Sequence, residues 1–121
     1  MKGNNPQEVK AIMDKYYESL GIPNNLKSRA RKDLVPRVAL ANAIVDFYTL
    51  TSIGEAMDKD HATIIHYTKM DETYAMHYKS YVYFKKGARK ICDILFGEKT
   101  LVETMLERIE QFKEEFEQDE A

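Results

Sequence analysis

The stretch that decides the fold runs from residue 50 to residue 66 and reads Leu50-Thr51-Ser52-Ile53-Gly54-Glu55-Ala56-Met57-Asp58-Lys59-Asp60-His61-Ala62-Thr63-Ile64-Ile65-His66. Its first half predicts a short helix that is capped by Thr51 or Ser52 and ends at Met57. After a two-residue turn, Asp60 can cap a second helix that reaches about Met70. The pair predicts a helix-turn-helix whose second helix opens with short polar side chains.

Helical periodicity extends from this stretch toward both ends of the chain, and no convincing period-two alternation indicates strands. Upstream, apolar residues at helical spacing predict a helix over about 6–20, a loop over 21–25 and a central core helix over about 34–47. Downstream, a further helix is expected over roughly 72–95. The sequence therefore predicts an all-α protein, a multi-helix bundle that contains the helix-turn-helix.

The chain after Gly97 has a different character. Thr100 and Glu103 have the spacing of a capping box, which predicts the start of another helix. Apolar residues then follow at alternating spacings of three and four, as in a helix that packs along another helix; they are Val102, Met105, Ile109, Phe112 and Phe116. We expect a domain over residues 1–96 and an acidic amphipathic helix and tail over 97–121. This helix packs either on the chain's own body or on a protein partner or second copy.

Length and composition indicate a single folded domain. The chain has 121 residues, of which 44% are hydrophobic and 31% are charged, and this is ordinary for a globular protein. No apolar run has the ~20 residues of a membrane span and no hydrophobic signal region follows Met1, so a cytoplasmic location is expected without membrane contact. The one cysteine, Cys92, excludes an internal disulfide and is expected as a small apolar residue of a helix.

Charge is distributed unevenly along the chain, although the net charge is only −2. Residues 98–121 contain nine acidic and three basic residues, a net charge of −6. Residues 1–97 contain fifteen basic and eleven acidic residues, a net charge of +4. Because the local field attracts the phosphate backbone, a basic body of this kind fits a protein that binds nucleic acid.

Two segments supply the chemistry that DNA recognition needs. Five basic residues occur within residues 27–37, and they suit contacts to phosphate. At the start of the predicted second helix, Asp60 can accept a hydrogen bond from cytosine, and the Ala62 methyl can touch a thymine methyl. His61 and Thr63 can bond or pack against exposed base edges, because the N-terminal end of such a helix enters the major groove.

Five pieces of the chain, in order, resemble the C-terminal DNA-binding domain of the bacterial replication initiator DnaA, which is related in architecture to the Trp repressor. The resemblance covers roughly residues 6–95. The pieces are Lys15-Tyr16-Tyr17, the basic loop Lys27-Ser28-Arg29, the helix entry Val35-Pro36-Arg37, the helix Leu50-Thr51-Ser52-Ile53-Gly54 and the recognition helix Lys59-Asp60-His61-Ala62-Thr63-Ile64-Ile65-His66.

The resemblance implies a stand-alone protein that binds double-stranded DNA in replication initiation or its regulation, with a phage or mobile element as one possible source. It implies that Arg29 enters the minor groove, where A·T-rich sequence narrows the groove. The expected base contacts are Arg29, Asp60, His61, Ala62 and Thr63. The expected phosphate contacts are Lys27, Arg31, Lys32, Arg37, Thr51, Lys59 and Lys69.

Enzymatic function is not expected. The five glycines are too isolated to form a phosphate-binding loop, so the chain lacks an ATPase motif. The three histidines do not form a zinc motif, and no nucleophile is placed in a recognisable catalytic pattern. We therefore expect no cofactor and no metal.

Two other functions remain open from the sequence. The fold could serve as an adaptor for protein partners, with the acidic helix docking a partner or covering the DNA-binding face. The chain could also be a dimeric transcriptional regulator that resembles the Trp repressor.

Several residues also have plain structural interpretations. Asp60 could act only as a helix cap, and His61 could be an ordinary surface residue. His66 is expected to bond a backbone group. Tyr74, Tyr78 and Tyr81 are expected in the core, not as a platform for stacked bases.

Overall fold

The computed structural model describes residues 2–97 and 109–110 of the chain. The helices are α1 (Pro6–Leu20), α2 (Arg31–Ile44), α3 (Leu50–Met57), α4 (His61–His77) and α5 (Lys79–Cys92), followed by a π-helical turn, η1 (Asp93–Gly97). Within the described residues, β-pairing is limited to an isolated bridge between Gly3 and Tyr48. The predicted all-α class is confirmed. Of the helix expected over 100–117, only residues 109 and 110 are described, and both are helical.

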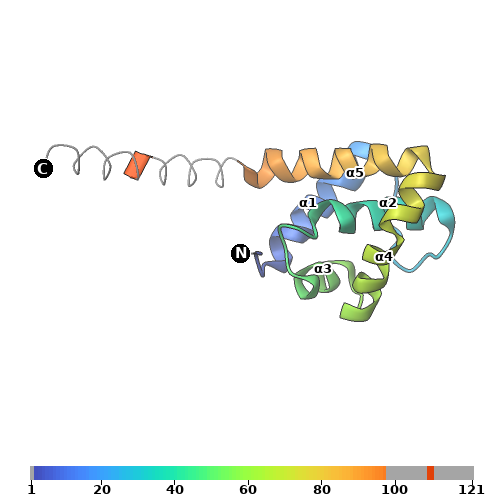
Figure 1. Ribbon diagram of the computed structural model, residues 1–121, viewed down its shortest axis with the longest axis horizontal. Helices are drawn as coiled ribbons and strands as arrows, with labels where there is room; N and C mark the ends of the chain where they lie inside the picture. Colours follow the sequence, from blue (N-terminus) through green and yellow to red (C-terminus); the bar gives the residue numbers. More distant parts are fainter. Residues whose placement is uncertain (1, 98–108, 111–121) are drawn as a thin grey trace, which may run out of the picture.

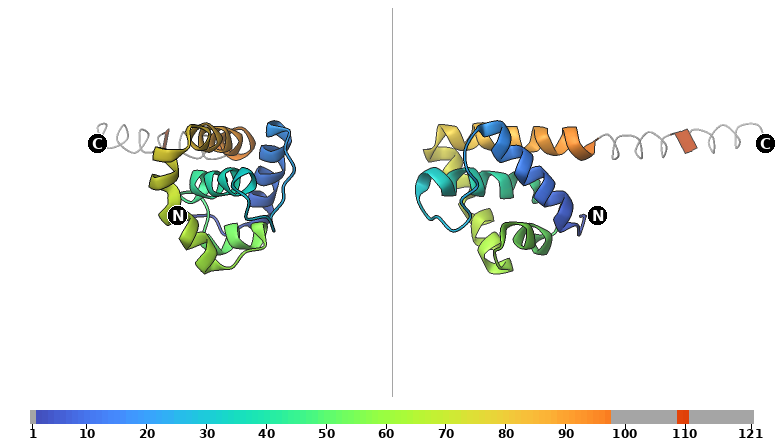
Figure 2. Two further views of the ribbon diagram at one scale, coloured as in Figure 1. Left: turned by 90° about the vertical axis from the view of Figure 1, so that its right-hand side faces the viewer. Right: turned by 180° about the vertical axis from the view of Figure 1, so that it is seen from behind.

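The helices form layers around α2. Figure 1 shows α5 across the top of the molecule, with α3 and the beginning of α4 at the bottom. Figure 2 shows α2 enclosed between α1, α5 and the descending α4. In this part of the chain, no helix combines the length and apolar character that crossing a bilayer requires.

Helix α2 is the central core helix, as its wide apolar face predicts. Every residue from Val35 to Ile44 is buried, and α4 and α5 pack closely against this segment. Ala39, Ala41 and Ala43 have small side chains that let these neighbours come close. Most of the core is therefore built around one short helix.

The bounds of α2 differ from the predicted range of 34–47. The helix begins at Arg31 because the extended residue Ala30 offers its carbonyl to the backbone N–H groups of Asp33 and Leu34. It ends at Ile44, whose carbonyl accepts from the N–H groups of both Phe47 and Tyr48, and residues 45–47 form a turn. The N-terminal strap, residues 3–5, pairs with the end of this turn. Gly3 donates to the Phe47 carbonyl (2.8 Å) and accepts from the Thr49 N–H (3.0 Å).

Helix α1 has the bounds that the sequence predicts. Asn5 caps it by accepting a hydrogen bond from the Glu8 backbone N–H, and Gly21 ends it in a left-handed conformation (φ 66°). The Tyr16 hydroxyl on its buried face donates to the Pro36 carbonyl at 2.9 Å. The Tyr48 hydroxyl donates to the Glu8 carboxylate at 2.7 Å, which joins α1 to the segment after α2.

The expected single helix over 72–95 is wrong, and so is the expected end of the preceding helix near Met70. Helix α4 continues to His77, and the extended residue Tyr78 (φ −126°, ψ 111°) separates it from α5. No glycine or proline marks this break in the sequence. The Tyr78 ring packs edge-on against Tyr74, four residues earlier (5.2 Å between centroids), and its tertiary contact is with the Arg31 guanidinium of α2 (5.3 Å).

The aromatic residues around this break belong to the core, as predicted. Tyr81 is fully buried and packs edge-on against Tyr74. Tyr74 and Tyr78 are both partly buried and pack against the core. The Asp71 carboxylate accepts from the Tyr81 hydroxyl and from Lys85 Nζ (3.1 Å), so it ties α4 to α5. Cys92, at the end of α5, is also buried in the core, as expected, and burial raises the pKa of its thiol.

Burial of tyrosines predicts alkaline unfolding. Burial raises the pKa of five phenols, namely Tyr16, Tyr17 (to about 12), Tyr48, Tyr74 and Tyr81. The folded state therefore keeps protons that the unfolded state loses above about pH 10. We expect the free energy of unfolding to be independent of these groups below about pH 10 and to fall as the pH rises further. Denaturant titrations between pH 8 and 12, with phenolate absorbance, measure this; a flat profile contradicts it.

Candidate functional site

The α3–α4 pair begins at a network of short polar side chains. Thr49, not the predicted Thr51 or Ser52, caps α3 by accepting from the Ser52 N–H at 3.2 Å. The buried Ser52 hydroxyl donates to Asn4 Oδ1 at 2.8 Å and lies 2.8 Å from the Thr49 hydroxyl. The N-terminal strap therefore fixes the start of α3.

The turn between α3 and α4 depends on close backbone contact. Asp58 adopts a left-handed conformation (φ 54°), and the Lys59 N–H donates to the Gly54 carbonyl at 2.8 Å. A Cβ atom at Gly54 would lie 2.7 Å from the Lys59 carbonyl oxygen. Only glycine permits this approach, so Gly54 sets the angle between the two helices.

Gly54→Ala is expected to lower the free energy of unfolding by about 1–3 kcal/mol, because the methyl group must displace the turn backbone. Gly87→Ala is the matched control. Gly87 lies within α5 with open space at its Cβ position, so alanine should stabilise that helix by about 0.5–1 kcal/mol. Denaturant unfolding of both variants measures the difference; equal effects would refute the close contact.

Asp60 caps α4, as predicted. Its Oδ1 accepts from the Thr63 backbone N–H (2.8 Å) and from the Thr63 hydroxyl (2.6 Å). These hydrogen bonds lower the pKa of Asp60, with the side-chain bond as the larger cause. The two expected base contacts therefore bond one another. His61 and Ala62, beside them, are exposed.

The exposed face of α4 continues with His66 and Lys69, four and seven residues after Ala62. The expected structural role of His66 is wrong. Its ring is exposed, and no hydrogen bond joins it to another described side chain or backbone group. The face therefore presents Ala62, His66 and Lys69 together to solvent.

Arg37 is a buried basic side chain with three hydrogen bonds to other segments of the chain. It is only 2% exposed, and its Nη2 donates to the carbonyls of Asn25 (2.6 Å) and Ser28 (2.9 Å). Its Nη1 lies 3.4 Å from the Tyr67 hydroxyl on α4. The expected contact of Arg37 with phosphate is wrong, because burial and these partners hold its guanidinium inside the fold.

A second α2 residue reinforces this link. Asn42 Nδ2 donates to the Tyr67 carbonyl (3.0 Å) as well as to the Val38 carbonyl within α2. Together, Arg37 and Asn42 fix α4 at Tyr67, and Arg37 also fixes the loop that carries Lys27 and Arg29. The loop and α4 thus share one anchor.

Arg37→Met is expected to destabilise the protein by about 2–4 kcal/mol, because two loop carbonyls lose a charged donor in a buried position. Arg29→Met is the control, since Arg29 is exposed in the same loop and should change stability by less than about 0.5 kcal/mol. Thermal and denaturant unfolding measure both. Equal stability of the Arg37 variant and the wild type would contradict the anchor.

The other predicted phosphate contacts occupy different positions. Lys27 and Thr51 are exposed, as is Arg29, and Lys59 is half-buried in the turn. Arg31 and Lys32 lie in the first turn of α2, not in the loop. Ser28 shapes the last part of that loop, since its hydroxyl accepts from the Ala30 N–H at 3.2 Å.

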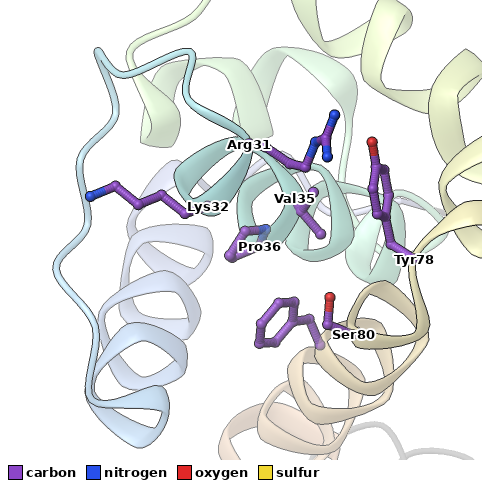
Figure 3. A pocket seen from close by; sticks show the side chains of 7 residues that line it. Arg31, Lys32, Val35, Pro36, Tyr78 and Ser80 are labelled. Atoms are coloured by element: carbon purple, nitrogen blue, oxygen red, sulfur yellow. The ribbon is translucent and has the colours of Figure 1, made fainter.

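A hollow of about 510 Å³ lies between the beginnings of α2 and α5. Its lining residues are Arg31, Lys32, Val35, Pro36, Tyr78, Ser80 and Phe84. Figure 3 shows Arg31 and Tyr78 side by side at one edge, while Lys32 points away on the other side. The hollow thus has an apolar floor and a cationic edge. It adjoins the basic loop through Arg31.

The sequence missed the anchoring role of Arg37, Asn42 and Tyr67. Asn42 gave the one usable signal, because a lone amide within the otherwise apolar run 38–44 needs a buried partner. Nothing in the sequence marked Tyr67 as a hydrogen-bonding partner, since an aromatic residue on a helix commonly packs in the core.

Comparison with known proteins yields no match to this chain among family models, curated proteins or solved structures.

Proposed function

We propose that the protein binds double-stranded DNA sequence-specifically, with α3 and α4 acting as a helix-turn-helix. The first turn of α4 would enter the major groove, and the basic loop would reach the adjacent minor groove and backbone. The observation that carries this proposal is the Arg37 anchor, which holds the exposed basic loop and α4 in one fixed arrangement.

The chemistry of the α4 start supports major-groove contact. His61 has an exposed ring that can donate or accept, and the exposed Ala62 methyl suits a thymine methyl. Asp60 keeps its second carboxylate oxygen for a cytosine amino group while it caps the helix through Oδ1. Thr63 donates its hydroxyl proton to Asp60, so it is left to contact DNA as an acceptor.

Exposed basic side chains near the start of α2 and on α4 supply the electrostatic attraction to DNA. Lys27, Arg29 and Lys32 are exposed near the start of α2, and Lys69 is exposed on α4. Phosphate contacts of this kind position a protein without specifying sequence. Arg29 is assigned to the minor groove through the resemblance to DnaA.

We further propose a role in replication initiation or its regulation, which rests on the same resemblance. The chain has no ATPase motif, so it would mark or block a site without melting DNA itself. Such a role in a bacterial cell places the protein in the cytoplasm. An adaptor function, with the acidic C-terminal segment engaging a protein partner, is the alternative from a different class.

Fluorescence anisotropy tests the proposal with a DnaA-box duplex and a random duplex pool at several salt concentrations. We expect site-selective binding that weakens steeply with salt, and a loss of about 1–3 kcal/mol for either His61→Ala or Arg29→Ala. Lys15→Ala is the control, since Lys15 is an exposed α1 residue beside Glu18 and should leave affinity unchanged.

Absence of binding to both duplexes at low salt, by the full chain and also by a form without residues 98–121, would refute DNA binding. A parallel sample without residues 98–121 distinguishes a DNA-binding surface that this acidic segment covers from a surface that cannot bind DNA. If neither form binds, the adaptor function gains support. If both bind the two duplexes equally, selectivity for the DnaA box is excluded and backbone attraction accounts for the measured binding.

A further inference from the structure

All charged residues of helix α5 are basic. Lys79–Cys92 contains five basic residues and no acidic residue. Two of these cations have partners, since Lys85 pairs with Asp71 at 3.1 Å and Arg89 lies 3.9 Å from Asp46. The other three, Lys79, Lys86 and Lys90, are exposed and pair with no carboxylate of the described residues.

These three lysines share one face of α5. Lys79, Tyr83, Lys86 and Lys90 are spaced by four, three and four residues, which places them in a single stripe along a helix. Tyr83 is 70% exposed within this stripe, and Ile94, four residues beyond Lys90, is 66% exposed. The stripe therefore combines positive charge with large apolar side chains that nothing in the described chain covers.

The sequence after Gly97 has the complementary character. Residues 98–121 have a net charge of −6, and their apolar residues recur at the three-four spacing that predicts a helix packing along another helix. Ile109 belongs to this apolar set. It is helical and 50% exposed, so the body of its own chain does not bury it.

We propose that two copies of the chain pair antiparallel, with the α5 stripe of each copy against residues 100–117 of the other. Charge along the chain changes sign near Gly97, so an antiparallel pair places each basic segment on an acidic one. A parallel pair would place like charges together. The antiparallel arrangement has twofold symmetry and is closed, because the same surface is used twice.

The position of α5 keeps this pairing separate from the proposed DNA site. Figures 1 and 2 agree that α5 lies on the opposite side of the molecule from α3 and the start of α4. The charge, exposure and helical spacing of α5 support this pairing whether or not the chain binds DNA.

Light scattering and sedimentation velocity of the full chain test the pairing. We expect a dimer at about 0.05 M salt whose dissociation constant rises as salt approaches about 1 M, because screening weakens exposed ion pairs. The triple variant Lys79→Glu, Lys86→Glu, Lys90→Glu should raise the dissociation constant by roughly 10²-fold. Lys2→Glu, Lys10→Glu, Lys15→Glu is the control, since it changes net charge equally at exposed sites elsewhere and should still dimerise.

A mixing experiment identifies the partner segment. The reversed variant Glu103→Lys, Glu107→Lys, Glu110→Lys should also be monomeric alone. Mixed with the Lys79, Lys86 and Lys90 variant, it should form a heterodimer, because each reversed segment then meets its opposite charge. Circular dichroism establishes that both variants are folded. A monomeric wild type at low salt, a dimer that persists in either variant, or a mixture of folded variants that stays monomeric would each overturn the proposal.

Discussion

The hydrogen bonds of the buried Arg37 guanidinium are the interaction on which the candidate site depends. A charge at 2% exposure must find hydrogen-bond acceptors within the protein, and all of those it uses lie outside its own helix. Two are carbonyls of the loop after α1, and one is the Tyr67 hydroxyl. An irregular loop and a helix far along the chain are therefore oriented by the same side chain.

Packing around α2 and the tight turn at Gly54 add to the Arg37 contacts in holding α4 in place. Small alanines in α2 let α4 and α5 approach one central helix, and the hydrogen bond from Asn42 to the Tyr67 carbonyl holds α4 against it. The glycine at position 54 then lets the turn lie against α3 at a distance that no side chain would permit. A small core can thus hold an exposed first turn of α4 in a defined position.

Local signals predicted the parts of this fold that local chemistry determines. The caps Asn5 and Asp60 and the stop at Gly21 act within a few residues of their own helix, so the sequence alone located these helix ends. The Tyr78 ring at the break packs against Arg31 of a distant helix, and the turn that ends α2 pairs with the distant N-terminal strap. These helix ends could not be found from periodicity. Arg37 was mistaken for a surface cation for the same reason, since its burial is a property of the assembled fold.

The N-terminal strap has a consequence for the order in which the chain folds. Its bonds join Gly3 to Phe47 and Asn4 to Ser52, segments more than forty residues apart in the chain. Contacts of such long sequence separation carry a large loop-closure cost, so they form after the local helices. The start of α3 is therefore expected to be the last element to become ordered and the first to open. Hydrogen exchange of the α3 amides, faster than that of the α2 amides, would reveal this opening.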